Sequence, residues 1–182
     1  SSHRRQRQMC IRDSKYRDPK RTGLISILHP WESGYDNSPL WDKPMSKIKT
    51  ELNLYYKRKD NKIVNQSQRP LKIDYDRYVT IKNHLKEMNY DPKKLYFKSK
   101  FNVVDVGFNS LFLKALKDMD FLLRCIDKRN SSIKKYILLN ESRLVKLFNS
   151  KKMTFKNKDI RNNSLVAIPS ITNFFMLFAD LK

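Results

Sequence analysis

The feature that most constrains the fold is an apolar stripe that runs from residue 108 to residue 126. Apolar side chains recur there at steps of three and four residues over about five turns, which is the period of an amphipathic helix. Asp105 and Asn109 are both candidate caps for its start, and the polar run at 127–130 would end it. Such a helix needs a partner for its apolar face, so the chain is expected to fold around packed helices.

Further stretches carry the same helical period. One helix is predicted over residues 75–88 and another over 131–148, the second with Ser131 or Ser132 as its cap. A third begins around Pro169, because proline is favoured in the first helical turn.

Residues 151–163 are polar and lack the helical period, so we expect a loop there with room for a short hairpin. Elsewhere one helix follows another across short connections, which predicts an all-α domain of antiparallel hairpins. Over residues 74–181 no sheet of more than two short strands is expected. The spacing alone leaves a bundle, a solenoid and a helical barrel open.

The composition disfavours membrane and metal proteins. No run of about 18 apolar residues occurs and no signal-peptide core follows the basic start, which predicts a cytoplasmic protein without a membrane partner. The two cysteines and three histidines show no zinc-ligand spacing, so neither a metal nor another cofactor is expected. Cys125 lies beside the apolar stripe and is predicted to be a buried, inert thiol.

The net charge of +21 suggests a polyanionic partner. Four tyrosines near lysines and arginines fit a basic helical module that binds nucleic acid: Tyr55, Tyr56, Tyr75 and Tyr78. Lysine nevertheless outnumbers arginine two to one and asparagine is abundant, as codon drift in an AT-rich genome would produce. No predicted helix carries a basic stripe, so nucleic acid is the weaker alternative partner.

One segment does not fit the helical pattern. Residues 28–42 read LHPWESGYDNSPLWD and hold both tryptophans of the chain together with three carboxylates. One interpretation is a structured turn, in which Gly34 takes a positive φ, Asn37 or Ser38 caps a helix starting at Pro39, and the tryptophans pack inside. The other is a functional loop, because binding and catalysis concentrate in loops held by a rigid scaffold.

The stretch HPWESGYDNSPLWD closely resembles the HPWESG-x-DNSP-x-W signature of the mannosylglycerate and glucosylglycerate hydrolases, relatives of processing α-glucosidase I and, more distantly, of trehalase. Two further stretches are similar to this family: Arg69-Pro70 followed by DYDRY at 74–78, and VDVGFNSL at 104–111. The similarity spans most of residues 24–125. It implies part of an (α/α)6 barrel of six helical hairpins, with the site at its mouth.

The resemblance implies that Asp36 is the general acid and that the general base is a Glu beyond residue 182. Hydrolysis with inversion needs one protonated carboxyl at the glycosidic oxygen and a second carboxyl about 6.5–9.5 Å away to activate water. Glu32 lies on the same short loop as Asp36 and would face the same side of a sugar, so a supporting role is expected for it. Asp105 is expected to cap a helix rather than to act as a second acid.

The same resemblance makes three further residues candidates for substrate binding. Trp31 offers a flat apolar face to the C–H face of a pyranose. Arg69 is a fork-shaped donor for sugar hydroxyls or for the carboxylate of a glycerate aglycone. Asn37 either orients Asp36 or caps the next helix. Trp41 is expected to pack against a helix.

Together these features predict a glycoside hydrolase that acts on an α-glucosyl or α-mannosyl linkage, in a glycerate-type or small oligosaccharide substrate, by an inverting mechanism. Residues 15–182 are predicted to be an incomplete catalytic domain, without its N-terminal part and its C-terminal half, and inactive alone. A non-catalytic carbohydrate-binding barrel is an alternative, beside the nucleic-acid-binding module. The oligomeric state is not indicated by the sequence.

The first fourteen residues are set apart from this description. Residues 7–14 back-translate to AGACAGATGTGTATAAGAGACAG, which resembles the transposase-end adapter of sequencing libraries. We therefore predict that residues 1–14 are a translated adapter, disordered and outside the fold.

Overall fold

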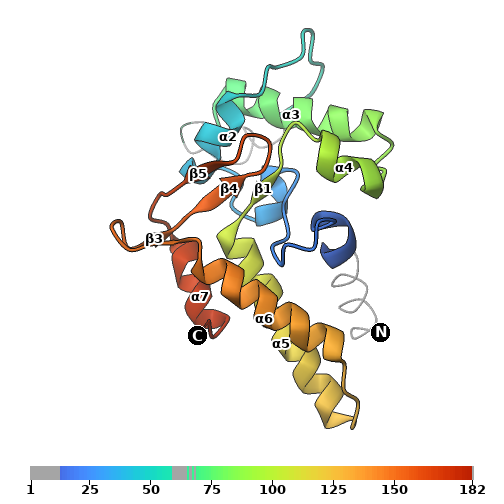
Figure 1. The fold of residues 1–182 in the computed structure, drawn as a ribbon. Coiled ribbons are helices and arrows are strands. Elements are labelled where there is room, and N and C mark those ends of the chain that lie inside the picture. Colours follow the sequence, from blue (N-terminus) through green and yellow to red (C-terminus); the bar gives the residue numbers. More distant parts are fainter. Residues whose placement is uncertain (1–12, 59–64, 66, 68, 182) are drawn as a thin grey trace.

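The computed structural model describes residues 13–58, 65, 67 and 69–181. Its longer helices are α3 (Lys72–Glu87), α5 (Val106–Cys125) and α6 (Ser131–Val145), with the shorter α4 (Pro92–Lys98) between α3 and α5. Helices are thus confirmed in the three regions where a long apolar period predicted them. Figure 1 shows α5 and α6 side by side at one end of the molecule and α3 with α4 at the other.

Side-chain caps fix the starts of α5 and α6. Asp105 accepts a hydrogen bond from the Phe108 backbone N–H at 2.7 Å, so Asp105 is the cap among the two candidates. Asn130 caps α6 by accepting from the N–H groups of Ser132 and Ile133 at 3.0 and 3.2 Å. The expected serine cap of α6 was therefore wrong by one or two positions.

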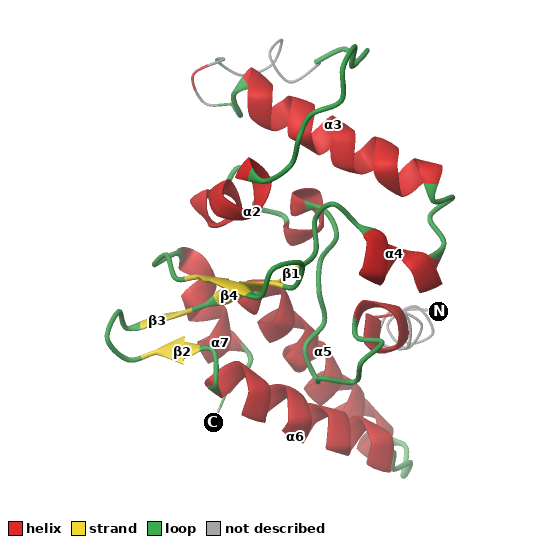
Figure 2. Cartoon of the chain, turned by 45° about the horizontal axis from the view of Figure 1, so that its top comes forward, coloured by secondary structure: helices red, strands yellow, loops and turns green. Residues whose placement is uncertain are grey.

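A small antiparallel sheet lies between the two groups of helices (Figures 1 and 2). It consists of β1 (Val103–Val104), β4 (Asn157–Asp159) and β5 (Ser164–Val166), in the order β1-β4-β5. The expectation that no sheet would exceed two strands is wrong. Strands of two or three residues are too short to show an alternating pattern, and β1 pairs with residues far along the chain.

The polar region after α6 also contains a separate hairpin. β2 (Phe148–Asn149) pairs with β3 (Thr154–Phe155), which supplies the short hairpin that the loss of helical period left room for. The helix expected around Pro169 is present as two short pieces, η6 (Ile171–Phe174) and α7 (Phe175–Phe178). Ser170 caps the first of them by accepting from the Thr172 N–H at 3.3 Å, so Pro169 precedes the cap.

Strand β1 separates two parts of the core. The side chains of consecutive strand residues point to opposite faces. Val103 accordingly lies in one buried cluster with Trp41 and Ile81, and Val104 lies in another with Leu113 of α5. The first cluster connects residues 28–42 to α3, so this segment rests on a packed core.

The segment 28–42 contains two one-turn helices, η2 (Pro30–Ser33) and η3 (Pro39–Trp41), and leads into α2 (Asp42–Ser46). A further one-turn helix, η1 (Asp13–Arg17), begins the described part of the chain. Of the residues predicted to be a translated adapter, 1–12 lie outside the described residues, and the last two, 13 and 14, lie at the start of η1. A closed six-hairpin barrel stays a prediction.

Cys125 is exposed, which contradicts its predicted burial. It is the last residue of α5 and lies beside Ile126, itself 61% exposed, so the end of the helix projects beyond the core. Among the described residues, no helix is long and apolar enough to cross a membrane.

Candidate functional site

An open pocket lies between residues 28–42, which we term the site loop, and the beginning of α3. Its volume is about 330 Å³, and we term it the Asp36 pocket; it is lined by Trp31, Asp36, Arg69 and Tyr75. Three of the four residues predicted for the site are thus brought together. Asn37 is exposed and is not among the lining residues.

The site loop is folded by its own turn residues. The His29 Nδ1 accepts from the Trp31 N–H at 3.1 Å, and Pro30 begins η2. Gly34 ends this turn with a φ of +80°, a conformation that favours glycine. Ser38 then caps η3 through its Oγ, so Ser38 and not Asn37 is the cap. The features of a structured turn and of a binding loop therefore coexist in one segment.

The two tryptophans of the site loop have different environments. Trp41 is 1% exposed and belongs to the core, as expected for a packing residue. Trp31 is 43% exposed, and its ring lies 4.3 Å from the His29 ring and 5.7 Å from the Tyr78 ring. The Trp31 ring therefore packs against two aromatic rings and is still partly exposed, and it presents an apolar face to the Asp36 pocket.

Tyr75 completes an aromatic wall, a role that the sequence patterns did not indicate. Its ring centroid lies 6.3 Å from that of Trp31, and the Tyr56 ring stacks on it at 5.2 Å. The Arg58 guanidinium lies over the same ring, 4.5 Å from the centroid. Tyr75 lies at the end of the first turn of α3, six residues after Arg69. This closeness in sequence to a candidate binding arginine is the one signal that could have indicated Tyr75 as a pocket residue.

Several charged side chains act on one another and on Tyr78, which follows the pocket residue Tyr75 on α3. Burial raises the pKa of Asp42, and the Asp74 carboxylate raises it further, whereas Arg77 opposes both. Arg77 donates to the Asp74 Oδ1 at 2.9 Å. Burial and the carboxylates of Asp36, Asp74 and Asp42 raise the pKa of Tyr78, so its hydroxyl keeps its proton at neutral pH.

Tyr35 anchors the middle of the site loop to the start of α5. Its ring stacks on Trp41 with centroids 5.7 Å apart, and its hydroxyl donates to the Asp105 carboxylate. Asp105 is fully buried and also accepts from Asn157 Nδ2 at 2.8 Å. A Cβ on Gly107 would lie 2.7 Å from the Tyr35 hydroxyl oxygen, so glycine permits this approach. Asp105 therefore caps α5, as expected, and the structure adds a role as the anchor of Tyr35.

Glu32 supports the loop rather than opening into the pocket. Its Oε1 accepts from Arg17 Nη2 at 2.7 Å, and its Oε2 accepts from the Leu28 N–H at 3.2 Å. Both carboxylate oxygens are engaged within the fold, which agrees with the supporting role expected for this residue.

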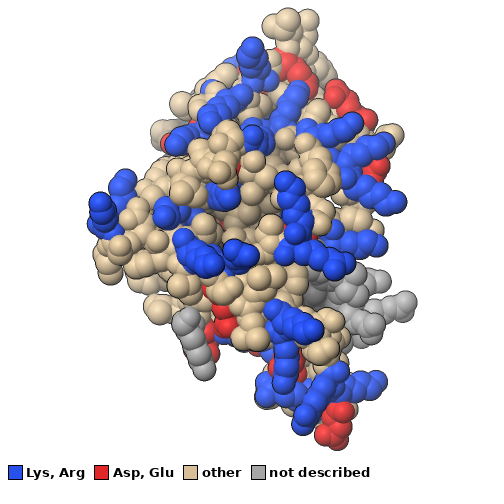
Figure 3. Space-filling view, in the orientation of Figure 1, with Lys and Arg blue, Asp and Glu red and all other residues tan. Residues whose placement is uncertain are grey.

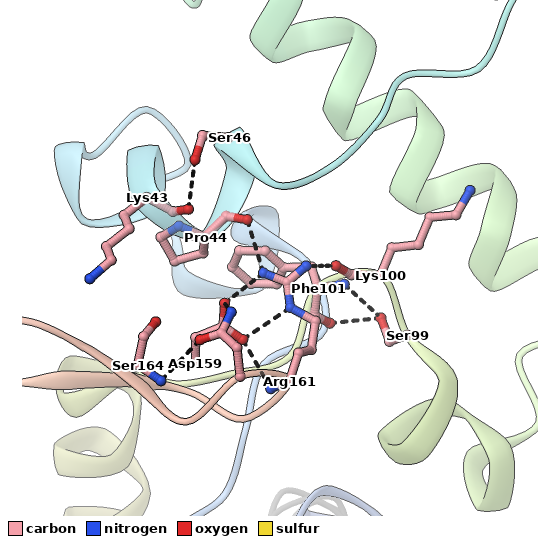
Figure 4. A network of polar contacts seen from close by, with 10 residues as sticks. Lys43, Pro44, Ser46, Ser99, Lys100, Phe101, Asp159, Arg161 and Ser164 are labelled. Carbon is pink, nitrogen blue, oxygen red and sulfur yellow. Dashed lines mark hydrogen bonds and ion pairs between the residues drawn. The ribbon is translucent and has the colours of Figure 1, made fainter.

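Arg161 ties α2, which follows the site loop, to the turn between β4 and β5 (Figure 4). The guanidinium donates to Pro44 O at 2.9 Å, to Asp159 Oδ2 at 2.7 Å and to the carbonyl of Lys100. Arg161 thereby joins three segments that are distant in the sequence. Among the described residues, no group of three His, Cys, Asp or Glu side chains is arranged to hold a metal ion.

The sequence matches a known family and its members. Residues 14–182 match the family described as the mannosylglycerate hydrolase MGH1-like glycoside hydrolase domain. A mannosylglycerate hydrolase of Thermus thermophilus is 40% identical over 163 residues, which cover 90% of this chain and 39% of that protein. The glucosylglycerate hydrolase of Mycolicibacterium hassiacum is 39% identical over 97 residues, covering 53% of this chain and 22% of the relative.

Solved structures agree with the sequence matches. The crystal structure of a GH63 mannosylglycerate hydrolase from Thermus thermophilus in complex with Tris superposes with a TM-score of 0.92 at 36% identity, over 99% of this chain and 45% of that chain. Its complex with glucose superposes with a TM-score of 0.87 over the same shares. The chain therefore spans less than half the length of these relatives.

Proposed function

Because the chain belongs to the mannosylglycerate hydrolase-like glycoside hydrolase family, we propose that it carries the general acid of an inverting glycoside hydrolase. The observation that supports this most directly is the Asp36 pocket, where a carboxylic acid, the open face of Trp31 and the Arg69 guanidinium share one cavity. An acid beside an apolar face and a fork donor is suited to a sugar and its leaving group.

In the proposed reaction, the Asp36 carboxyl gives its proton to the glycosidic oxygen as the bond from that oxygen to the anomeric carbon breaks. A second carboxylate, about 6.5–9.5 Å away, removes a proton from the attacking water. Among the described residues that line the pocket, Asp36 is the one with a carboxyl group. We therefore propose that the general base is a Glu outside the 182 residues, and that residues 15–182 form part of a larger catalytic domain.

The proposed substrate is an α-glucoside or α-mannoside with a glycerate-type or other small aglycone. Relatives are named mannosylglycerate and glucosylglycerate hydrolases, and solved structures of one relative hold glucose or D-glycerate. In this chain, Arg69 lines the pocket, and Arg58 lies on Tyr75 beside it. This positive charge is suited to a carboxylate on the aglycone.

The distribution of charge gives no separate support to nucleic-acid binding. In Figure 3, Lys and Arg are spread over the face shown, with Asp and Glu among them, instead of forming one stripe. A non-catalytic carbohydrate-binding protein would keep the same pocket and is distinguished by the absence of turnover.

The proposal is tested on the complete product of the reading frame that encodes this chain. We expect it to hydrolyse mannosylglycerate or glucosylglycerate and to release the β-anomer first, because inversion at an α-linkage gives that anomer. Proton NMR in the first minutes of the reaction reads the anomer directly. Binding of these compounds without hydrolysis would favour the carbohydrate-binding alternative, and release of the α-anomer would exclude the inverting mechanism.

A further inference from the structure

Tyr78, in the second turn of α3, lies beneath the site loop. It is 3% exposed, and its hydroxyl donates to the backbone carbonyl of Asp36 at 2.6 Å. This hydrogen bond joins α3, a helix of 16 residues, to the backbone of the proposed general acid. Of the two neighbours of Asp36, Asn37 is exposed, and Tyr35 is held from the other side of the loop by Trp41, whose Nε1 donates to the Tyr35 carbonyl at 2.9 Å.

A second contact joins the same tyrosine to the start of the loop. The His29 Nδ1 accepts from the Trp31 N–H, so the ring proton of neutral His29 lies on Nε2. His29 Nε2 then donates to the backbone carbonyl of Tyr78 at 3.0 Å. The Tyr78 ring also lies 5.7 Å from the ring of Trp31. Tyr78 therefore contacts the loop at its first turn, at the pocket tryptophan and at the acid.

We infer that Tyr78 is a positioning residue that holds the Asp36 backbone, and with it the general acid, at the glycosidic oxygen; the inference rests on the proposed function of Asp36. A general acid acts only within hydrogen-bond reach of its target, and a displacement of about 1 Å can cost about 10²-fold in rate. Arg69 and Tyr75 line the pocket from outside the site loop, so loss of the Tyr78 bond to the loop should leave these substrate contacts in place.

The test is Tyr78→Phe in the complete gene product, compared with Tyr136→Phe. Phenylalanine keeps the ring and its volume and removes only the donor, so the variant is expected to fold. Tyr136 on α6 also loses a hydroxyl bond, to Asp18 Oδ2 at 2.7 Å, but α6 lies away from α3 (Figure 1). Tyr136→Phe therefore controls for the loss of a structural hydrogen bond.

For Tyr78→Phe we expect kcat on the glycosylglycerate to fall about 10- to 100-fold with KM within about threefold, and turnover of a glycosyl fluoride to fall much less. A fluoride leaves with little protonation, so it does not depend on the position of the acid. Tyr136→Phe should match the wild type on both substrates. Equal losses on both substrates for Tyr78→Phe would overturn the inference, because a general structural effect does not discriminate between leaving groups.

Amide hydrogen exchange supplies a measurement that does not need turnover. Tyr78→Phe should speed exchange in the site loop while leaving α5 unchanged, and Tyr136→Phe should leave the site loop unchanged. If the wild type hydrolyses neither glycosylglycerate, the proposed function fails, and the exchange result still decides whether Tyr78 holds the loop. Unchanged exchange in the site loop would overturn the inference.

Discussion

Asp36 lies on the link between two helical turns, each of which is fixed by a neighbour. Gly34 ends the first turn in the left-handed region, and Ser38 caps the second through its side chain. Neither turn uses the side chain of Asp36, so the local backbone does not depend on an acid at this position. A substitution there therefore tests chemistry in preference to folding.

Replacing Asp36 with Asn keeps the shape of the side chain and removes its proton. We expect turnover of a glycosylglycerate to fall by at least about 10²-fold, the lower range for general acid catalysis, while substrate affinity is retained. On a glycosyl fluoride, which needs little protonation, the loss should be much smaller. Steady-state kinetics on both substrates measures the difference.

Asn37→Ala is the matched control for this substitution, since Asn37 is adjacent and exposed and does not line the pocket. We expect its losses on the two substrates to be equal. Equal losses for Asp36→Asn would instead mean that Asp36 binds or orients the sugar and that the acid is elsewhere.

His29 makes the stability of the fold depend on pH. It is 5% exposed, and burial lowers its pKa from 6.5 to about 4, with the nearby Asp36 carboxylate acting in the opposite direction. The unfolded chain therefore binds more protons than the folded chain between these values. The contribution of neutral His29 is complete above pH 6.5 and is lost as pH falls toward 4, with an upper limit of about 3 kcal/mol.

Urea unfolding at a series of pH values measures this contribution. The free energy of unfolding should fall between pH 6.5 and pH 4, and His29→Gln should flatten that part of the profile. His84→Gln serves as the control, because His84 is more accessible and bonds to the Lys98 carbonyl away from the loop. An identical slope in wild type and His29→Gln would contradict the assignment.

Sequence reasoning placed some of these residues and missed others for a physical reason. The resemblance led to Trp31, Asp36 and Arg69, which the fold brings to one pocket. Tyr75 and Tyr78 were visible as helix residues but not as partners of the loop. Their place depends on how α3 approaches the site loop, and local spacing does not carry that information.

At the scale of elements, length decided what could be predicted. α5 and α6 run for several turns, so their apolar period is clear, whereas α4 has 7 residues and strand β4 has 3. Short strands gain most of their definition from pairing partners, and Val103 pairs with Asp159. The sheet is therefore a tertiary feature, and it is the part of the fold that the pattern could not show.

The start of α5 depends on Gly107. A Cβ there would lie 2.7 Å from the Tyr35 hydroxyl oxygen and 2.9 Å from Thr172 Cβ. We expect Gly107→Ala to lower the free energy of unfolding by about 1–3 kcal/mol through overpacking, which exceeds the gain of up to about 1 kcal/mol in helix propensity. Chemical denaturation measures the change.

Gly34→Ala is the comparison for this variant. Nothing lies within 4 Å of its added Cβ, and the φ of +80° alone should cost about 1–2 kcal/mol. The two glycines thus separate crowding from backbone strain. Wild-type stability in Gly107→Ala would show that Tyr35 and Thr172 move aside without cost and that this anchor of the site loop is loose.

At the scale of the whole molecule, the region around η6 and α7, which we term the apolar face, carries large apolar side chains that the described residues leave uncovered. Ile171, Phe174, Leu177 and Phe178 are 59–77% exposed on η6 and α7, and Leu111 on α5 is 41% exposed. Figure 1 shows α7 near α5, against which it packs. Several large apolar side chains exposed on neighbouring elements are typical of a contact region.

We therefore expect the 182-residue chain, expressed by itself, to associate and to be catalytically inert. Association should bury the apolar face, and the Asp36 pocket holds one carboxylic acid where hydrolysis with inversion requires two. Sedimentation velocity and binding of a hydrophobic dye report association, and a sensitive assay with mannosylglycerate and glucosylglycerate reports turnover.

The double substitution Leu177→Lys and Phe178→Lys is the matched variant, and it should reduce association and dye binding without creating activity. A monomer that binds no dye would contradict the assignment of this face, and measurable hydrolysis by the isolated chain would show that its own residues supply the second carboxylate.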